Sequence, residues 1–296
     1  MLAIFEGKDL NAMISHPDGD DRAPSTIPGA GVVIAYMWVT FERKEDVPAT
    51  FLHQITLSLD GYSEGLTIKT PNVTVNRTPV PVIGPPLRGA DWGAAHGPAN
   101  DTHHRRGLLT LNGHAYIAER FAIDWLRLTT SGAIHTGDAG KNVSYPGYGA
   151  EALAVADGSI TGKREGIAEN NPGTTDGPRI TLETICGNYV ILQFGPHLYA
   201  SYCHLQPGSI RVNPGDKVKR GQVLALVGNS GNSGAPHLHF QVCDDNSTLA
   251  CEGVPYALRS FVQETRGFNS PDGKPHPDIV HTLELPTYEM LVRFVQ

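Results

Sequence analysis

The sequence predicts an all-β protein. Segments rich in β-branched and aromatic residues recur at short spacing along the chain, and helical periodicity is almost absent. The 33 glycines and 22 prolines in 296 residues exceed their usual share of roughly 12% and indicate many turns between short strands. A hydrophobic content of 40% with 18% charged residues is typical of a folded globular chain.

Residues 1–80 are predicted to form a small N-terminal β module. Residues 31–41 are rich in β-branched and aromatic side chains, residues 49–60 alternate apolar with polar side chains, and residues 67–75 give a third strand. Four prolines between residues 79 and 86 then form a stiff, extended connection. We therefore place a domain boundary after residue 80.

Residues 81–296 are predicted to form a larger β domain, with its core at about residues 113–243. Turn residues separate a series of short strands, expected at residues 115–128, 151–156, 179–186, 188–194, 198–204, 222–227 and 237–243. Asp157-Gly158 predicts a tight hairpin, because glycine accepts the positive φ that primed turns require. Pro214-Gly215 predicts a second turn.

Charge and hydropathy exclude two classes of partner. The net charge of −7 argues against nucleic acid, whose binding relies on lysine and arginine to neutralise phosphates. No apolar run approaches the roughly 20 residues that a membrane span needs. The first residues lack a basic stretch followed by an apolar one, so either the protein is not exported or a signal peptide has been removed. We favour removal, which implies a periplasmic or extracellular protein.

The chain has four cysteines, Cys186, Cys203, Cys243 and Cys251. They are too few for a disulfide scaffold and lack the C-x-x-C spacing of structural zinc sites. Cys243 and Cys251 bracket a polar loop, so a local disulfide is plausible in an oxidising compartment. Free buried thiols are an equally good interpretation.

The strongest chemical signal is His237-Leu238-His239. In a strand, alternate side chains share one face, which places these two imidazoles about 6.5–7 Å apart along the chain. One can bind a metal while the other reaches a bound water. The simpler alternative is a pair of surface histidines, but the glycine-dense segment 228–234 directly upstream allows a tight turn into the strand. A phosphate-binding loop is disfavoured, because neither Lys-Ser/Thr nor a helix follows the last glycine.

Two further residues are candidates. His204 lies where an apolar strand runs into a turn, a position that presents an imidazole at a rim, although such a histidine is often structural. Asp124 is a carboxylate within the apolar segment 121–125, and a buried carboxylate needs a cation, hydrogen-bond donors or a metal. A salt bridge to nearby Arg120 is the simplest way to meet that need.

Taken in order, these motifs resemble the lysostaphin-type (LytM-like) zinc metallopeptidases of bacterial cell-wall turnover. The likeness rests on His204-Leu205, on the hairpin at residues 215–222, on Gly228-Asn-Ser-Gly and on His237 to Phe240. Residues 154–158 and 187–191 are similar to earlier strands of that family, and the likeness covers about residues 120–242. It implies an antiparallel β-sheet peptidase domain with an open groove.

The resemblance also implies roles for the candidate residues. Asp124 and His239 would ligate Zn²⁺, while His204 and His237 would flank the metal-bound water and the scissile carbonyl. Zinc in such a site lowers the pKa of its water to about 7 and polarises the carbonyl. The implied function is a zinc-dependent endopeptidase that hydrolyses peptide bonds in peptidoglycan cross-bridges or stem peptides.

One position departs from the family. Its first zinc ligand is a histidine four residues before the aspartate, where this chain has Arg120, and a guanidinium has no lone pair to offer a metal. The sequence identifies no third ligand in its place. His103, His104 and His114 lie upstream, and His104 is the most suggestive donor because its cluster leads into the Asp124 strand. His135-Thr-Gly-Asp138 echoes the motif, but with the wrong spacing.

The missing ligand leaves an alternative function open. With only two ligands, the third position is water or zinc is absent. The chain would then be a catalytically silent LytM-like module that binds cell wall or regulates a partner hydrolase.

Overall fold

The structure is a computed structural model that describes residues 3–17, 25–27, 29, 31–61, 63–174, 177 and 179–295. The chain divides into two units: Met1–Phe5 with Met37–Pro79, and Glu6–Tyr36 with Val80–Gln296. The division after Pro79 lies at the proline-rich connection, whereas residues 6–36 group with the larger unit. The division of the chain into an N-terminal module of residues 1–80 and a second domain of residues 81–296 stays a prediction.

The smaller unit contains two short antiparallel strand pairs. The strands β4 (Gln54–Leu57) and β5 (Leu66–Lys69) form a hairpin, and β3 (Thr50–Phe51) and β6 (Val73–Thr74), which flank it in the chain, pair with each other. A single 3-10 turn, η1 (Lys44–Asp46), precedes them.

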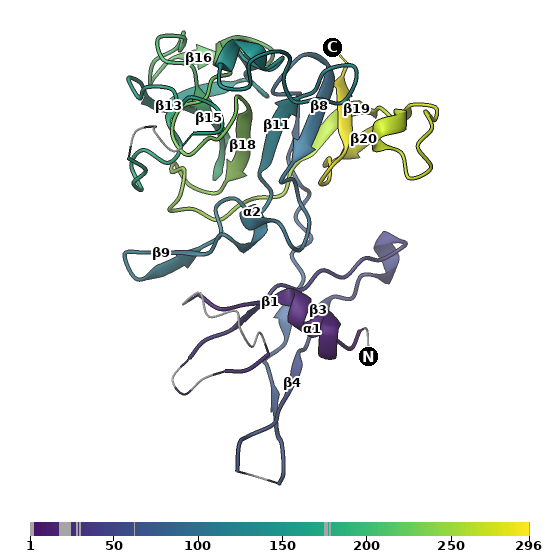
Figure 1. The fold of residues 1–296 in the computed structure, drawn as a ribbon. Coiled ribbons are helices and arrows are strands. Elements are labelled where there is room, and N and C mark those ends of the chain that lie inside the picture. The colour runs from purple at the N-terminus through teal and green to yellow at the C-terminus, as the bar shows by residue number, and fades with distance from the viewer. Residues whose placement is uncertain are drawn as a thin grey trace. The chain divides into compact units, whose positions relative to one another are not determined.

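The larger unit is organised around an 11-stranded sheet (Figure 1). The first five strands in spatial order are β16 (Lys217–Val218), β13 (Gly158–Arg164), β14 (Asn188–Gly195), β15 (Leu198–Leu205) and β18 (Leu238–Cys243). The next five are β11 (Ile123–Arg127), β8 (Gly89–Ala95), β21 (Leu291–Phe294), β19 (Ala257–Gln263) and β20 (Ile279–Glu284). These strands pair antiparallel, and β7 (Val82–Ile83) adds a parallel pairing to β19. The predicted all-β, antiparallel fold is confirmed.

Short elements complete the larger unit. Three further antiparallel pairs are β1 (Ile14–Ser15) with β2 (Ile34–Ala35), β9 (Leu109–Leu111) with β10 (His114–Tyr116), and β12 (Glu151–Leu153) with β17 (Val223–Leu226). The helical turns are α1 (Gly7–Met13), α2 (His103–Arg106), η2 (Asn142–Ser144) and η3 (Gly267–Asn269). No helix formed by the described residues has both the length and the apolar character to cross a membrane.

The central strands separate a core face from a polar face. Side chains alternate along a strand, so residues two apart share a face. One set is fully buried in the hydrophobic core: Ile123, Trp125, Val190, Leu192, Ala200, Tyr202, Leu238, Phe240 and Val242. Residues between them, among them Asp124, Cys203 and His239, point to the opposite face. The core therefore fixes the strands that carry the candidate site.

Three local predictions were wrong. Residues 179–186 form turns instead of a strand, because Thr184 Oγ1 donates to Arg179 O and accepts from Thr181 N, which satisfies the backbone locally. Residues 115–128 form β10 and β11 with turns between them.

The third wrong prediction is the hairpin at Asp157-Gly158. The strand β12 pairs with β17 and not with β13, so these residues do not join two paired strands. Gly158 is required for space: a Cβ there would lie 2.2 Å from Gln193 O.

Replacing Tyr202 with Phe should destabilise the core. The buried Tyr202 hydroxyl accepts a hydrogen bond from Val155 N at 3.0 Å, and both residues are fully buried. Without it, the buried N–H has no partner, which costs about 1–3 kcal/mol. Urea unfolding measures the loss. Tyr199→Phe is the control, because Tyr199 is only half-buried and water can replace its hydroxyl as the partner of Gln193 Nε2. An equal loss in both variants would contradict the assignment.

Candidate metal centre and active site

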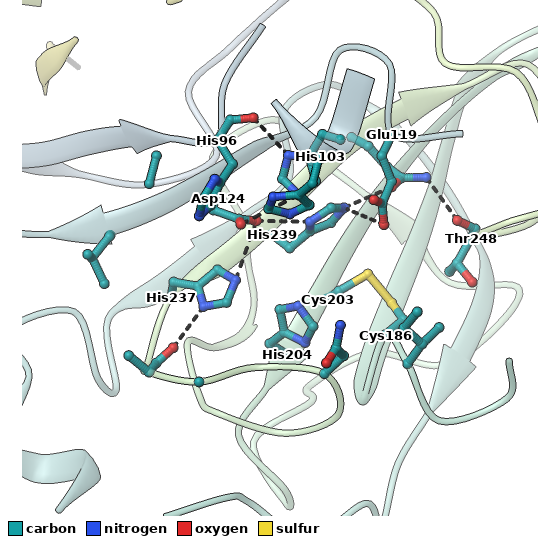
Figure 2. Close-up of a pocket in the computed structure, with 18 of the residues that line it drawn as sticks. His96, His103, Glu119, Asp124, Cys186, Cys203, His204, His237, His239 and Thr248 are labelled. Atoms are coloured by element: carbon teal, nitrogen blue, oxygen red, sulfur yellow. Dashed lines mark hydrogen bonds and ion pairs between the residues drawn. A yellow bond between two sulfur atoms is a disulfide. The ribbon is translucent and has the colours of Figure 1, made fainter. Parts of the chain in front are cut away.

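The candidate site is built on one row of residues across four neighbouring strands. Asp124 of β11 is the register partner of Ala95 in β8 and of His239 in β18, and His239 is in turn the partner of Cys203 in β15. Directly opposed residues share a face, so all four side chains lie on the polar face. Figure 2 labels three of them, Asp124, His239 and Cys203. The sheet register therefore brings Asp124 and His239 together.

His204 joins this row through an irregular backbone. By strand alternation it would face away from Cys203, yet both residues line the same cavity. His204 has φ +62°, a left-handed conformation that non-glycine residues rarely adopt. This local strain is of the kind that collects at functional sites.

The glycine-rich segment 228–234 positions His204. Ser230 O lies 2.8 Å from His204 Nδ1, and Ser230 Oγ donates to Leu205 O at 2.8 Å. Gly231 has φ +76°, and a Cβ there would lie 2.3 Å from Gly187 N. The tight turn predicted from the glycines is confirmed, and it serves to bring a carbonyl to the imidazole.

Backbone carbonyls set the tautomers of three histidines. Nδ1 of His104, His204 and His237 lies 2.8–2.9 Å from His96 O, Ser230 O and Ala235 O respectively. A carbonyl oxygen only accepts, so each Nδ1 carries the proton and each Nε2 keeps its lone pair when the ring is neutral. Three imidazoles thus leave Nε2 for ligation or proton transfer.

His239 is oriented the other way. Its Nε2 lies 2.8 Å from Gln241 Oε1, while Gln241 Nε2 donates to Thr248 O and so fixes the amide. The opposite nitrogen, Nδ1, lies 2.9 Å from Asp124 Oδ1. Buried ligand histidines in metal sites are oriented by such outer hydrogen bonds.

Asp124 is the acceptor at the centre of the site. Its side chain is 11% exposed, and His237 Nε2 lies 3.4 Å from Oδ1. His104 Nε2 lies 3.5 Å from Oδ2. Burial alone would raise the pKa of Asp124, but His237, His239 and His104 outweigh it and hold that pKa well below its ordinary value. Asp124 is therefore a carboxylate at neutral pH.

The histidines differ in charge. Burial lowers the pKa of His204 well below its ordinary value and that of His104 to about 3, so both are neutral at pH 7. Burial also acts to lower the pKa of His239, but the hydrogen bond and charge of Asp124 raise it to about 9. Without a metal, Asp124 and His239 form an ion pair, and ligation at Nδ1 would release that proton.

All four predicted site residues, Asp124, His204, His237 and His239, line one cavity of about 430 Å³. The cavity also contains residues that sequence reasoning did not single out, notably His96, Glu119 and Gln241. Gln241 lies two residues after His239 in β18, so strand alternation places both side chains on one face. This alternation could have identified Gln241 from the sequence.

The other sequence candidates divide between the site and the surface. His103 and His104 line the cavity, whereas His114 is exposed in β10. His135 packs against Tyr145 with ring centroids 5.5 Å apart and is not among the cavity-lining residues, as its spacing predicted. The suggested Arg120–Asp124 salt bridge is wrong, because Arg120 pairs with Glu252 at 2.9 Å.

Comparison with known proteins shows a likeness to one family. The profile described as peptidase family M23 matches residues 139–250. This part of the chain is therefore similar to M23 peptidases. The matched range includes His204, His237 and His239. It begins after Asp124, so the profile does not cover this candidate ligand.

Two curated relatives come from Vibrio cholerae serotype O1. Peptidoglycan DD-endopeptidase ShyA is 39% identical over 75 residues, which cover 24% of this chain and 17% of the relative. Peptidoglycan DD-endopeptidase ShyB is 39% identical over 71 residues, 23% of this chain and 16% of the relative. The match thus spans less than a fifth of either relative.

A solved structure of the lysostaphin catalytic domain from Staphylococcus simulans aligns at 22% identity and a TM-score of 0.29. That alignment covers 54% of this chain and 84% of that domain.

Two disulfides reinforce the larger unit. Cys243 and Cys251 form the predicted local bridge, which decides against free thiols, and Cys186 pairs with Cys203. The second bridge lies directly beside the site, since Cys203 precedes His204 and Cys186 O accepts a hydrogen bond from His204 N at 2.9 Å. It ties the strand that carries His204 to the turns at residues 181–187.

Removing the Cys186–Cys203 bridge should destabilise the larger unit. The double variant Cys186→Ser/Cys203→Ser frees a loop with a sequence separation of 17 residues, worth about 3 kcal/mol through chain entropy. Chemical denaturation of the oxidised proteins measures the difference. Cys243→Ser/Cys251→Ser should cost less, because its separation is 8 residues. Unchanged stability in the first variant would refute a structural role for the bridge.

Proposed function

We propose that the larger unit is an M23-type, zinc-dependent endopeptidase that hydrolyses peptide bonds in peptidoglycan cross-bridges or stem peptides. One observation carries this proposal: Asp124 and His239 lie together as potential ligands, while His204 and His237 present Nε2 to the same cavity. Acid or base groups beside the ligands of one metal ion are suited to the hydrolysis of a peptide bond.

The donor set fits zinc. Asp124 offers a carboxylate, and His239 offers Nδ1 once its proton has left; carboxylate and imidazole are both common zinc ligands. The outer partner Gln241 orients His239, as expected for a ligand histidine. When bound, zinc supplies Lewis acidity, which polarises a carbonyl and makes water acidic near neutral pH.

His204 and His237 act as the proton-transfer groups in this proposal. Their ring centroids are 4.7 Å apart, so a small reacting group lies within reach of both. The hydrogen bonds to Ser230 O and Ala235 O hold the rings in place and direct Nε2 toward the substrate. A neutral imidazole accepts a proton from the attacking water and returns it to the leaving amine.

The relatives support the proposed substrate, and the disulfides support the proposed location of the protein. The relatives ShyA and ShyB are named peptidoglycan DD-endopeptidases, which supports peptidoglycan peptides as the substrate. Two disulfides favour an oxidising compartment, in agreement with a periplasmic or extracellular protein.

The competing function is a silent module that binds cell wall or regulates a partner hydrolase. Its support is Arg120, which occupies the family's first ligand position and pairs with Glu252.

Replacing His239 with Ala should remove the metal while keeping the β fold, because the substitution deletes a ligand in a strand whose other face builds the core. Zinc content of purified protein, measured by mass spectrometry, is the readout, with circular dichroism to report the fold. His114→Ala, an exposed histidine outside the cavity, is the control and should keep its zinc. Equal zinc content in wild type and His239→Ala would exclude His239 as a ligand.

Replacing His204 or His237 with Ala should reduce hydrolysis of cross-linked peptidoglycan fragments by about 10²–10⁴-fold with zinc still bound, the usual contribution of positioned proton transfer. Product release followed by chromatography measures the rates. Wild-type turnover in both variants would remove their catalytic role. Inactivity of the zinc-loaded wild type would favour the silent module.

A further inference from the structure

The ligand missing from position 120 has a candidate elsewhere in the chain. Arg120 lies in the turn between β10 and β11, where its backbone N–H donates to Ile117 O, and its guanidinium pairs with Glu252. It contributes nothing to the polar face around Asp124. A catalytic zinc site usually has three protein ligands, so the proposed enzyme needs one more donor.

We propose that His104, from the short helical turn α2, is the third zinc ligand and replaces the histidine that the family carries four residues before its aspartate. This inference rests on the proposed zinc-dependent function and names the residue that completes its metal centre. The centre would consist of His104 Nε2, the Asp124 carboxylate and His239 Nδ1.

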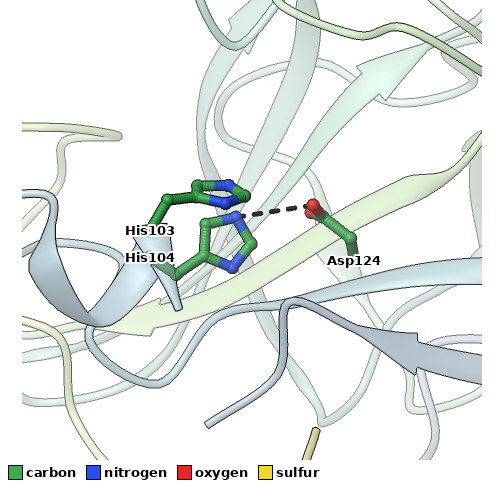
Figure 3. Close-up of side chains that lie close together, drawn as sticks. All are labelled: His103, His104 and Asp124. Carbon is green, nitrogen blue, oxygen red and sulfur yellow. Dashed lines mark ion pairs between the residues drawn. The ribbon is translucent and has the colours of Figure 1, made fainter. Parts of the chain in front are cut away.

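The geometry supports this set. His104 Nε2 lies 3.5 Å from Asp124 Oδ2 (Figure 3). His239 Nδ1 lies 2.9 Å from Asp124 Oδ1 (Figure 2). The rings of His104 and His239 meet edge to face with centroids 4.8 Å apart. The carboxylate thus lies between two imidazole nitrogens, and a small shift opens room for one cation among the three.

The burial and orientation of His104 are those of a ligand. The residue is 3% exposed, and its Nδ1 donates to His96 O at 2.9 Å. That carbonyl belongs to a residue with φ +50°, directly after β8, the strand next to β11. The outer hydrogen bond therefore comes from the neighbouring strand and turns Nε2 toward Asp124.

Several contacts fix the turn that carries His104. Thr102 caps α2 by accepting from Arg105 N, and Arg106 Nε donates to Asn100 O at 3.0 Å. Tyr36, from the N-terminal segment of the same unit, donates through its hydroxyl to Arg106 O and accepts from Asn100 Nδ2 through its carbonyl. A four-residue helical turn has little stability of its own, so these contacts provide the rigidity that a ligand needs.

The neighbouring His103 is the competing donor. A ligand atom of His103 lies within 4.8 Å of those of His104 and Asp124, and the two rings have centroids 4.3 Å apart. His103 is exposed, however, and its ring packs against His96 at 4.3 Å on the outer side of the cluster. The structure thus favours His104 as the ligand, and His103→Ala becomes a matched control in the same helical turn.

Zinc affinity of the purified, metal-free full chain decides the proposal. Competition with a chromophoric chelator gives the dissociation constants of wild type, His104→Ala and His103→Ala. Loss of an outer partner of a ligand already costs about 10–100-fold in affinity, so loss of His104 should cost more than about 100-fold. His103→Ala should stay within a few-fold of wild type.

A second variant guards against a fold defect. His104→Gln keeps most of the side-chain volume and should weaken zinc binding as strongly as His104→Ala. In the absence of metal, both His104 variants should unfold at about the same temperature as His103→Ala. Cobalt substituted for zinc adds a spectroscopic readout, because loss of one ligand changes the visible absorption of the bound ion.

The outcomes separate this inference from the proposed function. If wild type binds no zinc, the zinc-dependent function fails. If wild type binds zinc and His104→Ala binds it equally well, the function stands and the assignment of His104 is wrong. A loss confined to His103→Ala would transfer the role to His103 and overturn the inference.

Discussion

The burial of one carboxylate organises this site. Asp124 lies in a strand whose alternate residues are in the hydrophobic core, and such a charge is costly unless it is compensated. Compensation comes from His104 of α2, from His237 directly before β18 and from His239 within it, which converge within 3.5 Å of its oxygens. In the metal-free protein the proton on His239 supplies the positive charge. A bound cation would take over that task, so the same arrangement suits both states.

Irregular segments, more than strands, decide which histidine nitrogens face the cavity. The carbonyls that orient His104, His204 and His237 belong to residues outside the regular strands: His96 follows β8, Ser230 lies in the glycine-rich segment, and Ala235 lies directly after that segment. The sheet supplies the positions, and these carbonyls supply the tautomers. Glycine is needed there because the backbone of Gly231 packs against Gly187 too closely for a Cβ.

Arg120 shows that the chemistry of a metal site depends on the convergence of donors in space and not on their spacing in sequence. At position 120 a turn directs the guanidinium to Glu252, whereas α2 directs His104 to Asp124 from 20 residues earlier in the chain. An ion requires only that the three lone pairs meet. In the proposed metal centre, α2 would therefore satisfy the same requirement, because Thr102, Asn100 and Tyr36 hold this turn in place.

The sequence by itself determined the β class, most central strands and four residues that line the cavity. These depend on local information: alternation of side chains, turn residues and an ordered set of motifs. Only the tertiary structure decided that Asp124 is the register partner of His239, 115 residues away, and that His104 joins them. It also decided the Cys186–Cys203 pairing and the turns at residues 179–186. Such contacts follow from strand register and packing between distant segments, which local propensity does not encode.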